Sequence, residues 1–205
     1  MIPYQGRIRT IKMTQNYLLD TNAYFNLLKI LRKCSESTTE YPESIKQLLC
    51  GNLYISTITK VEIISALGKY ARGNSGGRSK CNCVISEEGT ICSNYKYTLA
   101  RKQWNKNQVK AWLQFIDETI TGKSSLVQLK LLPFSEKTID EAQRIVVHAL
   151  IHNFGSLDAM IAATAKESIN NHESITVITS DGGLKACLGK CGIPCWDALA
   201  QVKSR

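Results

Sequence analysis

The stretch Tyr17–Asn22, with the sequence YLLDTN, is the first hydrophobic run of the chain, and an acid follows its apolar residues directly. The apolar residues indicate a short strand, and the spacing of the apolar residues that follow predicts a helix over 22–33. Asp20 therefore lies at the carboxyl end of a strand and beside a helix N-terminus, which is where ligands bind in open α/β sheets. We expect Asp20 to be the first of four acids that hold a divalent metal.

Three further acids take comparable positions. Glu62 lies near the start of the helix after strand 53–56, Asp158 lies in the first turn of a helix, and Asp181 follows strand 175–179. The starts of helices that follow parallel strands lie at one edge of a sheet, so the four carboxylates can converge. Converging carboxylates repel one another, and a bound cation relieves this repulsion. All-oxygen ligands favour Mg²⁺ or Mn²⁺.

Each acid also has a purely structural interpretation. Thr59 and Glu62 match a capping box, in which Glu62 reaches back to the start of its own helix. Asp158 has the position of an acid that complements a helix dipole, and either Ser180 or Asp181 has the position of an N-cap. The metal hypothesis rests on the set of four and not on any single residue.

The alternation of strands and helices predicts the fold class. It is typical of a three-layer α/β/α sandwich with a mainly parallel sheet. We expect one domain over 1–205. Because Met13 is an alternative start, residues 1–12 are interpreted either as an extension or as a start-site artefact. Residues 73–103 break the pattern with a glycine-rich basic stretch and a small hairpin over 81–92, so we interpret them as an insertion. Strands are expected at 17–20, 53–56, 126–132, 175–179 and 193–196, and helices at 22–33, 42–50, 59–71, 104–120, 135–150, 156–165 and after 183.

The net charge of +9 at pH 7, with a pI near 9.2, favours a polyanionic partner, and solubility alone is the alternative explanation. The N-terminus lacks the apolar segment of a secretory signal, and the chain has no apolar run long enough to span a membrane. We therefore expect a cytoplasmic protein.

Eight cysteines in such a chain are more typical of reduced thiols or metal ligands than of a disulfide framework. Cys81, Cys83 and Cys92 are candidates for a small structural zinc site, although their spacing is not a usual paired pattern. Core packing is the alternative for the cysteines near the C-terminus. His148 and His152, one helical turn apart, are interpreted as structural.

Four segments of the sequence resemble the motifs of the PIN-domain family, most closely its VapC-type toxins. These segments are Tyr17–Asn22, Ser56–Glu62 (STITKVE), Ser156–Ala165 (SLDAMIAATA) and Val177–Asp181 (VITSD). The resemblance covers 13–72 and 125–197, while the insertion, the length and the Gly182-Gly183 pair depart from it.

The resemblance implies metal-dependent hydrolysis of RNA phosphodiesters. Asp20, Glu62 and Asp158 would be the principal metal ligands, and Asp181 would complete the site. Candidates to position water or phosphate are Thr21, Asn22 and Ser180, and candidates to hold the RNA backbone are Lys60, Lys69, Arg72 and Lys185.

The resemblance also implies partners: an antitoxin protein that blocks the acidic site, and a homodimer. The apolar face of helix 22–33 or 42–50 is the expected docking surface for the antitoxin. The alternatives are a PIN nuclease in RNA processing or DNA-end cleavage, and an RNA-binding module without catalysis. A phosphate-transfer enzyme with Asp20 as nucleophile is disfavoured, because Asn22 stands where such enzymes carry a second acid.

Overall fold

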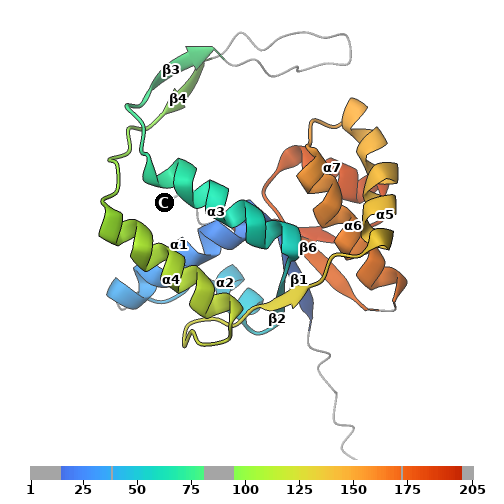
Figure 1. The fold of residues 1–205 in the computed structure, drawn as a ribbon, viewed down its shortest axis with the longest axis horizontal. Coiled ribbons are helices and arrows are strands. Elements are labelled where there is room, and N and C mark those ends of the chain that lie inside the picture. Colours follow the sequence, from blue (N-terminus) through green and yellow to red (C-terminus); the bar gives the residue numbers. More distant parts are fainter. Residues whose placement is uncertain (1–14, 38, 81–94, 172, 200–205) are drawn as a thin grey trace, which may run out of the picture.

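A five-stranded, fully parallel sheet forms the centre of the molecule (Figure 1). The computed structural model describes residues 15–37, 39–80, 95–171 and 173–199. The strands lie in the order β5-β2-β1-β6-β7. Their bounds are β1 (Asn16–Leu19), β2 (Asn52–Ser56), β5 (Lys130–Leu132), β6 (Ile175–Ile178) and β7 (Cys195–Trp196).

Helices cover both faces of this sheet, and the alternation of side chains along the strands decides which residues meet them. Leu19 and Ile178 belong to a core that they share with the first four helices, whereas Leu18 and Val177 belong to a second core with the last three. Successive strand residues point to opposite faces, so the two cores lie on the two sides of the sheet. This arrangement confirms the predicted α/β sandwich.

The helices are α1 (Thr21–Ser37), α2 (Glu43–Leu49), α3 (Thr57–Ala71), α4 (Lys106–Ile120), α5 (Glu136–Val146), α6 (Ser156–Asn170) and α7 (Gly182–Lys190), with a 3₁₀ turn η1 (Val147–Leu150) after α5.

Two elements differ from the sequence-based expectation. The strand expected over 126–132 is confined to β5, because the Leu129 N–H donates to the Thr119 carbonyl oxygen (3.1 Å) and so bonds this segment to α4. The helix expected over 135–150 ends at Val146 and tightens into η1.

The apolar faces of α1 and α2 are not docking surfaces. Leu27 and Leu28 of α1 and Ile45 and Leu48 of α2 are completely buried in the first core. The expectation that an antitoxin binds one of these faces is therefore wrong, because the sheet and the neighbouring helices already cover them.

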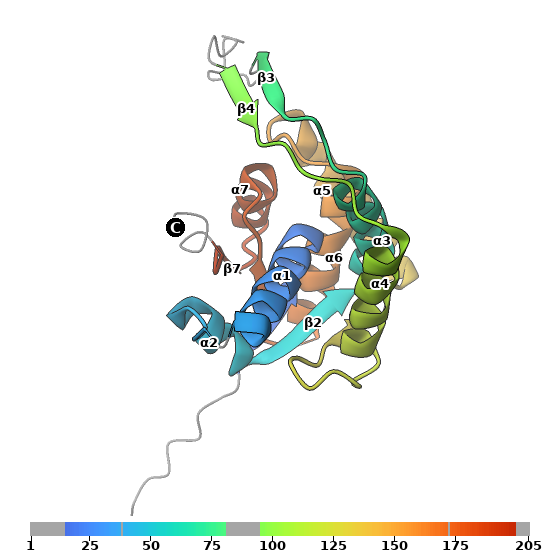
Figure 2. The ribbon, with the colours of Figure 1, turned by 90° about the vertical axis from the view of Figure 1, so that its left-hand side faces the viewer.

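The insertion carries a separate two-stranded antiparallel ribbon, which projects from the ends of α3 and α4 (Figure 2). Its strands are β3 (Gly77–Lys80) and β4 (Tyr95–Thr98). Two backbone hydrogen bonds of 2.9 Å between Asn74 and Arg101 close its base. Gly73, at φ +66°, lies so close to the Arg101 carbonyl oxygen that a Cβ would overlap it. The hairpin expected over 81–92, with its zinc candidates Cys81, Cys83 and Cys92, lies outside the described residues.

Two further observations concern the described part of the chain. Cys34, Cys50, Cys187, Cys191 and Cys195 are free thiols, and Cys187 is buried in the second core. No described helix combines the length and apolarity needed to cross a membrane.

Candidate active site

Asp20 occupies the buried end of β1. Its backbone N–H donates to the Ile178 carbonyl oxygen of β6 (3.1 Å), so β1 and β6 end at the same level. The residue as a whole is 3% exposed, and its Oδ1 accepts a hydrogen bond of 2.5 Å from the Ala23 N–H in the first turn of α1. The Thr179 side chain also hydrogen-bonds to this carboxylate. The first turn of a helix has unpaired N–H groups, and this bond holds Asp20 against the turn.

Glu62 reaches across to α1 and does not cap its own helix. Its Oε2 accepts a hydrogen bond of 2.6 Å from the Thr21 hydroxyl. The N-cap of α3 is Ser56, whose Oγ accepts the Thr59 N–H at 3.0 Å. The capping-box interpretation of Glu62 is therefore wrong, and Glu62 lies in the second turn of α3 instead of at its start.

Asp158 and Asp181 make the helix-start contacts that their positions predict. Asp158 Oδ2 accepts the Gly155 N–H at 2.9 Å, just before α6. Asp181 Oδ1 accepts the Leu184 N–H at 2.8 Å and caps α7. Each of these bonds engages one oxygen of the carboxylate, so capping and a second interaction are compatible.

A cleft of about 420 Å³ joins three of the four acids. Asp20, Glu62 and Asp158 all line it, although they come from three separate parts of the chain. Asp181 is not among its lining residues, but its negative charge acts on both Asp20 and Asp158. The complete lining is Asp20, Thr21, Asn22, Phe25, Asn26, Lys29, Glu62, Ser65, Ala66, Lys69, Tyr70, Arg101, Asp158 and Ile161.

The surroundings of Asp20 and Asp158 disfavour the charged forms of these two carboxyl groups. The pKa of Asp20 is raised to about 6, chiefly by burial, and the charges of Asp158 and Asp181 raise it a little further. The hydrogen bonds from Thr179 and Ala23 lower the pKa and offset part of this increase. Burial also raises the pKa of Asp158, and the charge of Asp181 adds to this. A buried, mutually repelling set of carboxylates attracts a cation, because the cation restores the balance of charge.

Comparison with known proteins places this chain in a family. The family model described as PIN domain matches residues 17–187. The chain belongs to the PIN-domain family. PIN domains are generally nucleases, and PIN nucleases generally use divalent metal ions.

Two solved structures are similar to this PIN domain over most of its length. The crystal structure of FitAcB from Neisseria gonorrhoeae is 19% identical, with a TM-score of 0.47 over 90% of this chain and 99% of that one. The crystal structure of VapBC2 from Rickettsia felis bound to a DNA fragment from their promoter is 16% identical, with a TM-score of 0.45. The match covers 89% of this chain and 98% of that one. None of the curated proteins compared with the chain matches it.

The residues predicted to position water or phosphate separate into two groups. Thr21 and Asn22 line the cleft of the PIN domain, but the Thr21 hydroxyl is engaged by Glu62. Ser180 lies outside the lining and donates to Asp197 Oδ1 at 2.7 Å.

The cations predicted to hold RNA separate in the same way. Lys69 lines the cleft. Lys185 instead pairs with Asp197 Oδ2 at 2.9 Å, while Lys60 and Arg72 are exposed and lie outside the lining.

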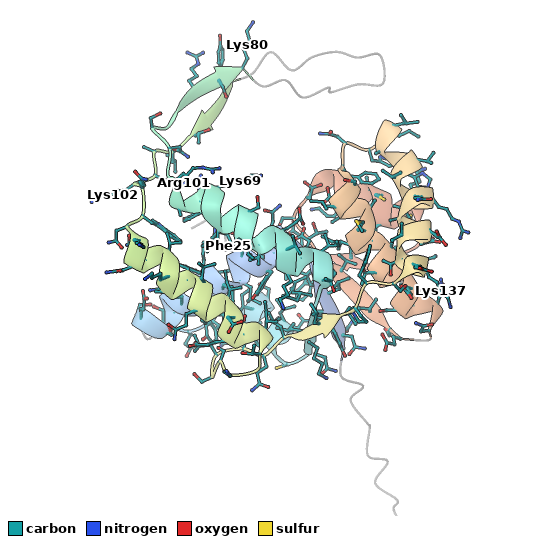
Figure 3. The ribbon with its side chains drawn as sticks, in the orientation of Figure 1. Phe25, Lys69, Lys80, Arg101, Lys102 and Lys137 are labelled. Atoms are coloured by element: carbon teal, nitrogen blue, oxygen red, sulfur yellow. The ribbon has the colours of Figure 1, made fainter. Side chains whose placement is uncertain are left out.

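The cleft also contains polar residues that the sequence analysis missed. Asn26 and Lys29 follow Asn22 at helical spacing on α1, so the periodicity of that helix could have identified them. Arg101 comes from the far end of the insertion and only the tertiary structure brings it here. Figure 3 shows Arg101 and Lys69 near each other at the end of α3 from which the ribbon projects.

The donor set of this cleft suits a hard cation that keeps part of its water shell. Within the described ranges, no three His, Cys, Asp or Glu side chains are arranged closely enough to hold an ion among themselves. Mg²⁺ commonly binds through one or two carboxylates and several waters, so it needs no closed shell of protein ligands. Asp20, Glu62 and Asp158 supply oxygen donors of this kind from the walls of one cleft.

Proposed function

We propose that this PIN domain is a Mg²⁺- or Mn²⁺-dependent endoribonuclease and the toxin of a type II toxin–antitoxin pair. The observation that carries the proposal is the convergence of Asp20, Glu62 and Asp158 on one cleft, with Asp181 close enough to influence two of them. Four acids from distant parts of the chain serve no common packing purpose, whereas a metal-dependent hydrolase requires them together.

The roles of the residues follow from their contacts. Asp20, Glu62 and Asp158 would hold the ion, directly or through water. The bound ion would activate a water molecule and offset negative charge that develops on the phosphoryl group. Thr21 orients Glu62 through its hydroxyl, and Ala23 holds Asp20 through its backbone N–H. Asn22 and Lys69 line the cleft, and they would contact water and phosphate there.

RNA as the substrate is supported by charge. The chain carries a net charge of +9, and Lys29, Lys69 and Arg101 line the same cleft as the acids. Cations beside an acidic metal site can hold the phosphates that flank the bond to be cleaved. Cleavage of DNA in place of RNA would support the alternative of a PIN nuclease that processes DNA ends.

The antitoxin partner is inferred from the family resemblance of the four motifs. Since the apolar faces of α1 and α2 are buried, the partner must use another surface. Large exposed apolar side chains occur on α3, at Val61 and Ile64, and around η1, at Leu150 and Ile151. A neighbouring gene that encodes a small protein, and a stable complex on co-expression, would test the pairing. A homodimer remains a prediction, to be tested by light scattering.

The decisive experiment is incubation of purified protein with total RNA, with Mg²⁺ or with EDTA, followed by mapping of the cut sites. Asp20→Asn and Asp158→Asn should each lower cleavage by at least about 100-fold, because a neutral amide is a poor ligand for a hard cation. Asp117→Asn, at an exposed acid of α4, is the matched control and should cleave like the wild type. Mg²⁺-dependent cleavage that survives in Asp20→Asn would contradict the assignment.

A further inference from the structure

Two more depressions continue from the acid cleft across the base of the insertion and onto α4. The second depression shares Tyr70 and Arg101 with the acid cleft. The third shares Trp104 with the second and Lys29 with the acid cleft. Because neighbouring depressions share walls, they form one continuous surface, which we call the aromatic groove. The residues that line its two outer depressions are Lys29, Arg32, Lys33, Glu36, Tyr70, Arg101, Lys102, Gln103, Trp104, Asn105, Gln108 and Trp112.

Aromatic rings form the floor of this groove. Tyr70 meets Trp104 edge to face at 5.2 Å between ring centroids, and Trp104 stacks on Trp112 at 5.6 Å with an interplanar angle of 15°. Trp112 is buried, whereas Tyr70 and Trp104 are partly exposed. The Trp104 N–H donates to the Ala71 carbonyl oxygen at 2.9 Å, which fixes the backbone of Trp104 to the end of α3. The groove therefore presents ring surfaces that are held in place from behind.

Cations from separate segments line these rings. The Arg101 guanidinium lies 4.5 Å from the Tyr70 ring centroid, and Lys29 Nζ lies 5.0 Å from the same ring. Lys102 adds a further exposed cation in the second depression. Of the described residues that line the two outer depressions, Glu36 is the acid, and it is paired with Arg32 at 2.9 Å. The groove thus combines positive charge with stacking surfaces.

We propose that the aromatic groove binds single-stranded RNA beside the cleavage site. Bases would stack at Trp104 and Tyr70, while phosphates would lie against Lys29, Arg101 and Lys102. The proposal rests on the proposed function, because it describes the path by which substrate reaches the acid cleft. Proteins that bind single strands combine cationic grooves with aromatic platforms in this way. A duplex keeps its bases stacked inside the helix, so it cannot use the platforms.

The base of the insertion gives the groove its shape in this chain. Arg101 is held by its two backbone bonds to Asn74, and Trp104 is held by Ala71, so the returning end of the insertion lies against α3. The insertion therefore supplies Arg101, Lys102 and the segment that leads into Trp104. A PIN domain with a short connection between α3 and α4 would lack these residues, and we infer that the insertion sets the preference for unpaired substrate.

Binding is best measured in the Asp20→Asn protein with EDTA, by fluorescence anisotropy of a labelled 12-nucleotide uridine RNA, so that cleavage does not interfere. Arg101→Gln should weaken binding by about 10-fold. The slope of the logarithm of the binding constant against the logarithm of the salt concentration should become shallower by about 0.7. Trp104→Leu should weaken binding roughly 5- to 150-fold, and Trp104→Phe should restore most of it. Affinity for a 12-base-pair RNA duplex should change far less in the Trp104→Leu protein.

Lys137→Gln is the matched control, since Lys137 is an exposed cation of α5 far from the groove (Figure 3). Circular dichroism should show that each variant is folded, and Arg101→Gln alters only an exposed side chain. If the Arg101→Gln and Trp104→Leu proteins both bind the uridine RNA as tightly as the Lys137→Gln protein does, the groove does not bind RNA and the proposal is overturned. Groove-dependent binding without Mg²⁺-dependent cleavage by the wild type would instead overturn the nuclease assignment alone.

Discussion

At the scale of single residues, the buried carboxyl group of Asp20 sets stability against function. It is almost completely buried, and its pKa is raised from 3.8 to about 6, chiefly by burial. Between these pH values the folded protein keeps a proton that the unfolded chain has lost, so stability falls as the pH rises through this window. Above pH 6 the folded protein bears the full cost of a buried carboxylate. A metal site is a physical reason for retaining such a residue.

Removing that charge should stabilise the metal-free protein. In EDTA at pH 7, Asp20→Asn should raise the free energy of unfolding by about 3 kcal/mol, since two pKa units correspond to this amount. Asparagine keeps an oxygen that can accept the Ala23 N–H, so the contact with α1 survives. The gain should largely disappear near pH 3, which is below the pKa of this carboxyl group in both the folded and the unfolded state of the wild type. Urea unfolding at the two pH values measures this difference.

Mg²⁺ at pH 7 should reverse the order, because it stabilises only a protein that binds it. A variant that is less stable than the wild type at pH 7 without metal would contradict the role given to the buried charge. Asp117→Asn again serves as the control, because Asp117 is exposed.

At the scale of elements, the approach of α7 to the segment before α6 places two of the acids. Gly183, in the first turn of α7, lies so close to Asn153 that a Cβ would overlap its carbonyl oxygen. Two residues further on, the Gly155 N–H holds Asp158. The glycine pair that departs from the family motif is thus partly explained, because the second glycine allows this close packing. Nothing lies within 4 Å of the Cβ position at Gly182.

The two glycines therefore make a matched pair of variants. Gly183→Ala should lower the free energy of unfolding by about 1–3 kcal/mol, because the backbone at Asn153 must shift to make room. It should also reduce RNA cleavage, since the shift reaches the segment that holds Asp158. Gly182→Ala should leave both properties nearly unchanged. Thermal unfolding and the cleavage assay test the pair, and equal behaviour of the two variants would show that the close approach has no role.

At the scale of the whole molecule, we propose one domain that carries a separable ribbon. The described residues of β3 are exposed, and the two strands pair only with each other within the described structure. The bonds between Asn74 and Arg101 already close the chain below the ribbon. Among the side chains that the structure describes in the ribbon, those of 77–80, Tyr95 and Thr98, none belongs to either buried core. The stability of the PIN domain should therefore not depend on the ribbon.

Replacement of residues 77–98 by an Asn-Gly turn tests this organisation. A two-residue turn suits the antiparallel connection that would remain. The midpoint of thermal unfolding should stay within about 2 °C of the full chain, which corresponds to no more than about 1 kcal/mol for a chain of this size. The shortened chain keeps Arg101 and Trp104, so it should still bind the uridine RNA. Loss of cooperative unfolding would show that the insertion is part of the domain core.

The order of the elements, the parallel sheet and the placement of Asp20 and Asp181 after strands could all be predicted from the residues alone. That the two strands are neighbours was seen only in the fold. Hydrophobic periodicity and strand–helix alternation are local properties, and the parallel sheet then brings the ends of its strands to one edge. The partners of individual side chains, in contrast, became known from the folded structure. Glu62 accepts a hydrogen bond from Thr21, 41 residues away in the sequence, although the sequence pattern predicted a local capping contact near Thr59. Arg101 lines the cleft and the apolar faces of α1 and α2 are buried because segments that are distant in the sequence pack together. Such packing cannot be predicted from a local sequence pattern.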